Sequence, residues 1–405
     1  MEFKAFMRPD GSAGVRNYLA IIPAGKCANR LAYRIFKETE NLSGEIDGVL
    51  PLLHTHPCVS LPEDNERALR ILAGLGKNPN VAGAIYVGVG CEPLSAESLA
   101  DQASESGKPI AWVTIKAAGS FDAAVDAGKQ IVAKMVRSFA GMERTAVSVE
   151  HLTIALKCGG SSAASSISSN PAVGHAMDLV VEGGGTVIFA EVLENVGAEE
   201  ILARRAANKD VLDTIYECIR RMESRVRQLG VDIRGAEPTQ ANIEAGLTTL
   251  EEKSLGAVMK TGSCPIVGAL RYGEAPRQPG LHFMDSPDDT PELFMGMAAA
   301  GAQLLVFSVG GGVAAKLQRT PGEVGRFDLV PVIKVIGDPH AYKGMEEYFD
   351  INAGTVIEGI EGVRDVGQRI FNEVLGVASG KRTKMELMRC DYREPLSIWC
   401  SQGKI

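Results

Sequence analysis

The sequence of 405 residues lacks features that would assign it to several common classes of protein. It contains no run of Lys and Arg and no basic stripe with interleaved aromatics, and its formal net charge of −8 argues against non-specific binding to nucleic acid or acidic membranes. Residues 1–11 lack the apolar core of a signal peptide. The longest weakly polar stretch, 295–315, contains Gln303 and a glycine triplet, which favours buried protein over a membrane span. We therefore expect a cytoplasmic protein with no nucleic-acid or membrane partner.

Nucleotide-binding motifs and internal repeats are absent as well. No segment makes a GxGxxG fingerprint with a following acidic residue, and no GxxxxGK(S/T) motif is present. No tandem repeat with a period of 20–50 residues is visible. A chain of this length can bury a large core without disulfide bonds, so the eight cysteines are expected to be reduced thiols or metal ligands.

Strand-like apolar runs alternate with helical patterns, which is typical of α/β domains with parallel sheets covered on both faces. In the first half we expect strands at 18–24, 47–53, 83–89 and 110–114, and helices at 28–40, 62–75, 94–106 and 121–140. In the second half we expect strands at 152–157, 185–190, 255–260, 303–309 and 331–336, and helices at 170–182, 197–229, 291–301 and 363–376. The pattern predicts two Rossmann-like α/β domains with mainly parallel sheets, at 1–145 and 146–405.

Cysteines recur at the ends of the apolar runs. Five runs with strand character each end in a loop of small or polar residues that carries a cysteine, namely Cys27, Cys58, Cys91, Cys158 and Cys264. Open α/β sheets bind ligands just beyond the carboxyl ends of their parallel strands. Thiols placed there repeatedly would converge on one crevice, which indicates a soft metal ion or a reactive centre.

A glycine- and serine-rich segment, 157–171, follows one predicted strand and precedes a helix that begins near Pro171. Gly159 and Gly160 let the backbone approach a ligand closely, and the serines that begin with Ser161 add hydroxyl donors. Exposed N–H groups at a helix start favour anions. The segment therefore predicts a binding loop for a carboxylate or a phosphate, with a surface linker as the alternative.

Candidate acid and base groups lie in several other loops. His54 belongs to a cluster of two imidazoles and a thiol at 54–58, so it could ligate a metal or exchange a proton. Glu92 directly follows a cysteine. Glu252 and Lys253 lie together before a predicted strand, where burial could lower the pKa of the lysine or its charge could clamp a carboxylate. Asp285 ends another short apolar run.

The order of these loops resembles that in the altronate dehydratase and galactarate dehydratase family of sugar-acid dehydratases. The matching segments are 8–11 with 14–17, His54 and Thr55 with Cys58, 90–92, 157–161 with Ser165, Ile167 and 170–171, Glu191 and Glu194, 246–249 with 252–256, 284–285 and 352–354. They span nearly the whole chain. The resemblance implies a fold of α/β domains and an iron-dependent β-elimination on a hydroxy acid.

Three positions depart from the family's usual pattern. Family members carry Asp where this chain has Ser162, and Gly where it has Ser166 and Pro57. Such changes are expected to alter the choice of acid substrate. One-chain members also begin with a small extra domain, whereas this chain starts directly at the segment of Arg8. The resemblance therefore implies the large subunit of a two-subunit enzyme, with a separate small subunit as partner, in a homo-oligomer.

A metal site follows from the resemblance and the repeated thiols together. Elimination begins with loss of a proton α to a carboxylate, and a metal ion can stabilise the dianionic intermediate. We expect Fe²⁺ or another divalent metal, with an iron–sulfur cluster as the alternative. The expected ligands are Cys27, Cys58, Cys91 and Cys158, with His54 as an alternative ligand.

The remaining roles are divided between substrate binding and proton transfer. The hydroxy or sulfo acid is expected to contact Arg16, Asn17, Gly159, Gly160, Ser161, Asn170 and Asp285. Lys253 or His54 would be the base, and Glu92 or Glu252 the acid.

Three functions are compatible with the sequence. The first is a lyase that dehydrates a hydroxy acid or sugar acid to a 2-keto-3-deoxy acid. The second is the large subunit of a sulfolactate sulfo-lyase, which releases sulfite and pyruvate. The third is an iron–sulfur redox protein or a ligand-binding protein without lyase activity.

Overall fold

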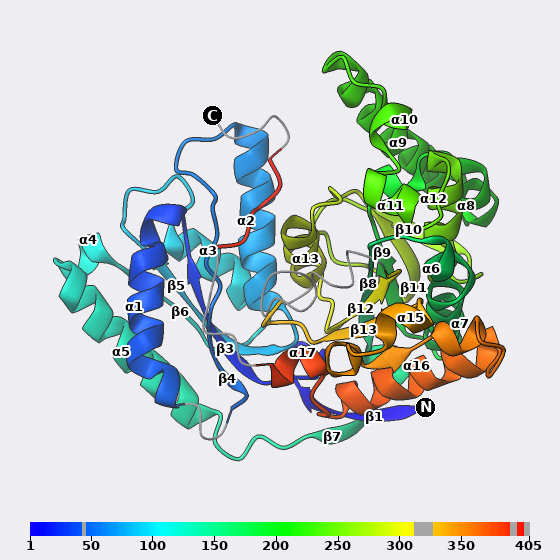
Figure 1. The fold of residues 1–405 in the computed structure, drawn as a ribbon. Helices are drawn as coiled ribbons and strands as arrows, with labels where there is room; N and C mark the ends of the chain where they lie inside the picture. Colours follow the sequence, from blue (N-terminus) through cyan, green and yellow to red (C-terminus); the bar gives the residue numbers. More distant parts are fainter. Residues whose placement is uncertain (43–45, 312–326, 389–394, 401–405) are drawn as a thin grey trace.

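The computed structural model describes residues 1–42, 46–311, 327–388 and 395–400 (Figure 1). Within these ranges the strands form three sheets, and the two larger ones are parallel. The predicted α/β fold with mainly parallel sheets is thereby confirmed. No helix in the described part of the chain is long and apolar enough to cross a membrane.

The N-terminal sheet has the strand order β4-β3-β5-β6 among the described residues. Its strands are β3 (Tyr18–Pro23), β4 (Gly48–Pro51), β5 (Val81–Gly88) and β6 (Ile110–Thr114). The helices around it are α1 (Asn29–Thr39), α2 (Pro62–Lys77), α3 (Ala96–Ser104), α4 (Ile115–Ala118) and α5 (Phe121–Ser138). Strand β3 is buried throughout, as expected for a strand covered on both faces. Leu19 and Ile21 pack with α1 and α5, whereas Ala20 and Ile22 pack with α2 and α3.

The C-terminal sheet has the order β10-β11-β9-β8-β12-β13-β14 in the described part of the chain. Its strands are β8 (Thr153–Gly159), β9 (Thr186–Phe189), β10 (Ile266–Leu270), β11 (Gly280–Met284), β12 (Leu304–Val309), β13 (Val332–Ile336) and β14 (Ile351–Asn352). The helices of this half are α6 (Ala163–Ile167), α7 (Ser169–Glu182), α8 (Glu199–Arg205), α9 (Lys209–Gln228), α10 (Ile233–Ala236), α11 (Gln240–Glu244), α12 (Leu250–Val258), α13 (Thr290–Ala299), α15 (Pro339–Tyr342), α16 (Val363–Ala378) and α17 (Lys384–Leu387). A small antiparallel sheet of β2 (Ala13–Gly14), β1 (Glu2–Met7) and β7 (Thr145–Ser148) lies near the predicted boundary at residue 145.

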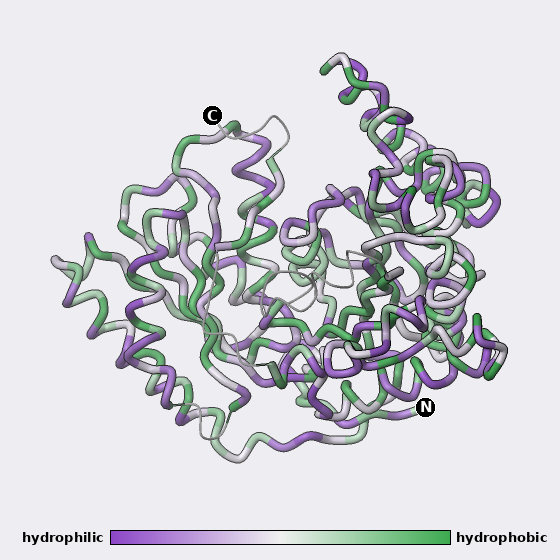
Figure 2. Tube along the Cα trace, in the orientation of Figure 1, coloured by the Kyte–Doolittle hydropathy of each residue, from purple (hydrophilic) through white to green (hydrophobic). Residues whose placement is uncertain are grey.

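The two parallel sheets share a hydrophobic core. Helices α2 and α13 lie between them in Figure 1, and one cluster of buried residues joins Ile22 and Ile71 of the first half to Ile188 and Leu305 of the second. The helices approach so closely that a Cβ at Gly74 would lie 2.5 Å from the carbonyl oxygen of Ala299. Figure 2 shows hydrophobic residues concentrated along the central strands. The two halves therefore bury apolar surface against each other.

Two predicted elements are wrong. Residues 255–260, expected as a strand, lie in α12 and the short 3-10 helix Met259–Thr261. The Thr249 hydroxyl accepts a hydrogen bond from the Glu252 N–H and starts α12, and a short apolar run cannot by itself distinguish a strand from a buried helix. The predicted helix at 197–229 is interrupted, because the Asn208 side chain accepts from the Val211 N–H and begins α9 anew.

Candidate active site

Three of the predicted thiols gather at the carboxyl edge of the N-terminal sheet. Cys27 follows β3, Cys58 follows β4 and Cys91 follows β5, which are neighbouring strands. The Sγ atoms of Cys27 and Cys58 are 3.7 Å apart. Partial burial raises the pKa of the Cys58 thiol to about 11, with further contributions from Cys27, Glu92 and Cys91. Cys27 and Cys91 are exposed to solvent.

The spacing of the first two thiols suits a metal ion. Two thiolates that each lie about 2.3 Å from one tetrahedral ion are about 3.8 Å apart. The observed separation of Cys27 and Cys58 has that size, whereas a disulfide would require bonded sulfur atoms at about 2.05 Å. Among the described residues, the exposed Cys91 does not complete a set of three donor atoms within 4.8 Å of one another with this pair.

Glu92 shapes this edge. Its carboxylate accepts hydrogen bonds from the backbone N–H groups of Val89, Gly90 and Cys91 at 2.5–3.1 Å. A Cβ at Gly25 would lie 3.3 Å from the Glu92 side chain. The side chain therefore holds the loop that carries Cys91 in place.

The fourth predicted thiol lies in a separate, buried cluster at the carboxyl ends of β8 and β9. Lys157 forms an ion pair with Glu191. The Lys260 ammonium lies 3.1 Å from the carboxylates of Glu191 and Glu194 and from the Cys158 sulfur. The Cys158 thiol donates to Glu194 at 2.7 Å. All five side chains are at least nine-tenths buried.

Oppositely charged groups stabilise one another in the buried cluster. Burial alone would raise the pKa of Glu194, but Lys260 and Lys157 lower it to about 2. Burial disfavours both ammonium groups, yet the thiol and carboxylates around Lys260, and Glu191 with Glu194 beside Lys157, keep both lysine pKa values above their ordinary level. Burial and Glu194 raise the pKa of Cys158. At neutral pH the cluster thus holds two ammonium groups, the carboxylate of Glu194 and a neutral thiol.

The same cluster could hold a metal ion. The donor atoms of Cys158, Glu191 and Glu194 lie within 4.8 Å of one another. The ammonium of Lys260 is 3.1 Å from each of these residues, so it occupies the position of a cation between them. A metal ion would have to displace the Lys260 side chain.

Asp288 and the backbone of Glu191 mark this region as unusual. Burial and the two neighbouring glutamates raise the pKa of Asp288 to about 8, and its buried Oδ1 has no hydrogen-bond partner. Its Oδ2 accepts from the Leu193 N–H at 3.2 Å. Glu191 has φ of 68°, the only positive φ of a non-glycine residue in the described ranges. Such strain persists mainly where function requires it.

The predicted binding loop lies beside this cluster. Gly160 adopts φ of 60°, and the Ser161 carbonyl accepts from the Asn242 side chain at 2.9 Å. The Gly310 backbone is so close that a Cβ there would lie 2.1 Å from the Gly160 oxygen. The Asn170 amide donates to Gly256, and its buried oxygen has no partner. The loop therefore presents backbone and amide groups at the end of β8.

Two residues that were predicted to contact the substrate instead form interactions inside the protein. The guanidinium of Arg16 is fully buried and forms an ion pair of 2.7 Å with Glu386. It also donates to backbone carbonyls near the end of α16. The Asn17 oxygen accepts from Arg8 at 2.8 Å. These contacts tie the first strands to the C-terminal part of the chain.

The predicted acid and base residues are also engaged by other groups. His54 is fully buried, with Nε2 2.7 Å from the Pro23 carbonyl and Nδ1 accepting from the His56 N–H, and burial lowers its pKa to about 4. Lys253 pairs with Glu237 at 2.6 Å. Burial would lower the Lys253 pKa, but Glu194 and Glu237 raise it.

Two further predicted residues have local partners. Glu252 accepts from the N–H and hydroxyl of Thr248 at the start of α12. Asp285 forms an ion pair of 2.5 Å with Arg221. The structure thus places Cys158 with a set of buried charged residues, of which only Cys158 is predicted as a site residue from the sequence. These residues are Lys157, Glu191, Glu194, Lys260 and Asp288. Lys157 and the glutamates lay in matched segments, whereas Lys260 and Asp288 gave no signal.

Comparisons with known proteins cover nearly the whole chain. The model of the C-terminal domain of D-galactarate/altronate dehydratases matches residues 149–401, and that of the second domain of D-galactarate dehydratase/altronate hydrolase matches residues 5–140. The beta subunit of (2R)-sulfolactate sulfo-lyase from Chromohalobacter salexigens is 31% identical over 95% of both chains. Altronate dehydratase from Bacillus subtilis is 31% identical over 97% of this chain and 76% of its own. Galactarate dehydratase (L-threo-forming) from Escherichia coli is 30% identical over 94% and 73%, respectively.

Proposed function

Because this chain belongs to the D-galactarate/altronate dehydratase family, we propose that it is a lyase that removes water from a hydroxy acid or sugar acid to give a 2-keto-3-deoxy acid. The relatives described above are named as dehydratases and a sulfo-lyase, so they share elimination chemistry. The observation that carries the proposal is the buried cluster of Lys157, Cys158, Glu191, Glu194 and Lys260 at the strand ends where open α/β sheets bind ligands.

The two lysines would stabilise the charge that develops during elimination. Loss of the α-proton puts a second negative charge on a substrate carboxylate. Lys157 and Lys260 are protonated and fixed by buried partners, so they need little rearrangement to face that charge. A preorganised contact of this kind is typically worth about 3 kcal/mol in the transition state.

Proton transfer would involve the acidic side chains. A substrate carboxylate that takes over the lysine contacts would remove the cations that hold the Glu194 pKa near 2, and Glu194 would then become a stronger base. Asp288, with its raised pKa, would be protonated at neutral pH and could donate to the leaving hydroxyl. Both groups lie beside Glu191, so they could act on neighbouring atoms of one substrate.

We also propose that Fe²⁺ or another divalent metal is held by Cys27 and Cys58, with Cys91 as a third ligand. Their thiol chemistry and the 3.7 Å spacing of the first pair support this assignment. The metal would supply Lewis-acid stabilisation of a substrate oxygen. Free thiols at all the described cysteines support a reducing compartment, the cytoplasm.

Sulfolactate cleavage is the second candidate. The sulfo-lyase beta subunit aligns over 95% of both chains, whereas the altronate and galactarate dehydratases extend well beyond this chain. That relative is named as a beta subunit, which supports an enzyme in which this chain works with a second, small subunit. Sulfite departs more readily than hydroxide, so the acid from Asp288 would matter less.

A substrate panel tests both functions. The purified protein, with and without a small subunit of the sulfo-lyase type, is incubated with altronate, galactarate and 3-sulfolactate, and 2-keto acid and sulfite are measured separately. Keto acid without sulfite supports dehydration, and sulfite with pyruvate supports sulfolactate cleavage. Absence of turnover on every acid in metal-loaded protein would contradict a lyase function.

A further inference from the structure

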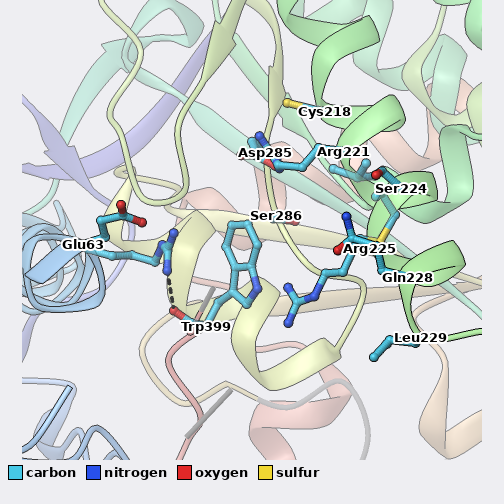
Figure 3. Close-up of a pocket in the computed structure, with 13 residues that line it drawn as sticks. Glu63, Cys218, Arg221, Ser224, Arg225, Gln228, Leu229, Asp285, Ser286 and Trp399 are labelled. Atoms are coloured by element: carbon cyan, nitrogen blue, oxygen red, sulfur yellow. Dashed lines mark hydrogen bonds and ion pairs between the residues drawn. The ribbon is translucent and has the colours of Figure 1, made fainter. Parts of the chain in front are cut away.

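A polar pocket of about 840 Å³ lies between helix α2, helix α9 and the C-terminal segment (Figure 3). Arg67 comes from α2, Arg221 and Arg225 come from α9, and Trp399 comes from the segment near the C-terminus. In Figure 3 the side chains of Arg225 and Trp399 point into the same space. The pocket is thus built by parts of the chain that are far apart in sequence.

Guanidinium groups are concentrated in this pocket, although the whole protein is acidic. Three arginines line it against Glu63 and Asp285. Arg221 is neutralised by Asp285 at 2.5 Å, and Arg67 by Asp64 at 2.6 Å.

Arg225 differs from the other two arginines. Its guanidinium has no ion-pair or hydrogen-bond partner among the described residues. An exposed arginine is usually just solvated, but here it faces a recess with two further guanidinium groups and the Trp399 ring, over which Arg67 stacks at 4.5 Å. Guanidinium groups bind carboxylates and related oxyanions through paired N–H donors. The recess therefore has the chemistry of an anion site.

The pocket also adjoins the buried cluster. Val192, which lines it, directly follows Glu191, and Ser286 lies two residues before Asp288. The Glu191 N–H is 3.5 Å from the Ser286 hydroxyl, so the two segments are in contact. The wall of the pocket at Val192 and Ser286 is therefore formed by the segments that carry Glu191 and Asp288.

We propose that this pocket binds a second anionic group of the substrate, at the end remote from the carbon that loses its proton, and that Arg225 determines this specificity. The inference rests on the proposed lyase function and deepens it. The substrate class is then an acid with two negative charges, a dicarboxylate or a carboxylate with a sulfonate, in preference to a monocarboxylate.

Binding measurements on the full chain test the proposal without requiring turnover. Isothermal titration calorimetry compares galactarate and 3-sulfolactate, which carry two charges, with altronate, which carries one. Arg225→Gln is expected to weaken binding of both dianions at least tenfold and of altronate less than threefold. Arg225→Lys should restore part of the affinity. Arg227→Gln is the matched control, because Arg227 lies in the same last turn of α9 but lines a different hollow, and it should leave all three affinities unchanged.

Several outcomes would overturn the inference. The inference is contradicted if Arg225→Gln lowers the affinity for all three acids equally or for none of them. It is also contradicted if Arg227→Gln lowers the affinities as much, or if the wild type binds neither dianion. A loss of small-subunit association in Arg225→Gln with acid affinities unchanged would contradict it as well. Charge-selective binding without turnover would instead contradict the proposed lyase function and leave the anion site standing.

Discussion

At the scale of single residues, each buried charge of the cluster is stabilised by a small number of partners. Lys260 contacts three partners at once, at 3.1 Å from each of Glu191, Glu194 and Cys158. A buried charge that loses its partner costs far more than a surface pair gains, typically about 3–5 kcal/mol. The lysine is therefore expected to matter for stability and for catalysis.

Replacing Lys260 by Met separates these two effects. Lys260→Met should lower turnover at least about 100-fold, because one stabilising charge is lost, and lower the free energy of unfolding by about 3 kcal/mol. Lys209→Met is the control, since Lys209 lies on the surface of α9 and pairs with the exposed Asp213. Rates on the best acid of the panel and denaturant melts provide the two readouts. Unchanged turnover in folded Lys260→Met would remove this residue from the mechanism.

The raised pKa of Asp288 leads us to expect that dehydration depends on pH. The Asp288 carboxyl has a pKa of about 8 and must be protonated to donate, so activity should be retained below that pH and fall as the pH rises through it. Asp288→Asn should lower kcat and abolish this alkaline limb. The measurement is a kcat profile from pH 6 to 10 at saturating substrate, with circular dichroism to verify the fold. An alkaline limb that persists in Asp288→Asn would assign it to another group.

At the scale of elements, the loops after parallel strands bring thiols together that are distant in sequence. Cys27 and Cys58 are 31 residues apart, yet β3 and β4 pair in parallel and deliver their sulfur atoms to within 3.7 Å. The loop after β5 adds Cys91, held by the hydrogen bonds of Glu92. The spacing is set by the sheet, so the pair should persist without metal.

Loss of the thiol pair should remove metal from the protein. Cys27→Ser/Cys58→Ser is expected to lose bound Fe²⁺ after anaerobic loading, because hydroxyl groups are poor ligands for a soft site. Cys264→Ser, a half-buried thiol outside the trio, should bind as much Fe²⁺ as the wild type. Elemental analysis after gel filtration measures the metal directly. Full Fe²⁺ content in the double variant would contradict this assignment and would favour Cys158, Glu191 and Glu194 as the metal ligands.

The elements also show what sequence reasoning can reach. Strands such as β3 and β5 were predictable, because continuous apolar runs flanked by glycine are typical of buried parallel strands. Residues 255–260 were not, because the apolar run there is as compatible with α12 as with a strand. Lys260 is not predictable as a site residue, because its partner Cys158 lies 102 residues away in the sequence. The same holds for Asp288, because its pKa is raised only when folding places it beside the two glutamates.

At the scale of the whole molecule, helices α2 and α13 join the two parallel sheets. The contact at Gly74 leaves no room for a side chain, because its Cβ would lie 2.5 Å from a backbone oxygen of Ala299. Close approach of this kind explains a glycine inside α2, where the residue is otherwise unfavourable.

Replacing Gly74 by alanine should therefore lower the stability of the protein, although alanine has the higher helix propensity. In an open helix site, Gly→Ala stabilises by up to about 1 kcal/mol. Gly74→Ala is expected to destabilise the protein by about 1–3 kcal/mol, because the backbones of α2 and α13 must separate. Gly376→Ala in α16 is the matched control, since its nearest neighbour would be the flexible Lys381 side chain at 3.6 Å, and it should stabilise. Thermal melts compare the two, and a stabilised Gly74→Ala would contradict the close packing.

The interior that α2 and α13 share has a consequence for how this protein is handled. Ile22 and Ile71 of the first half and Ile188 and Leu305 of the second belong to one cluster of buried residues. A fragment that ends after residue 140, between the two family matches, would expose a hydrophobic surface to solvent and is expected to aggregate. We therefore expect each half to fold more stably in the presence of the other.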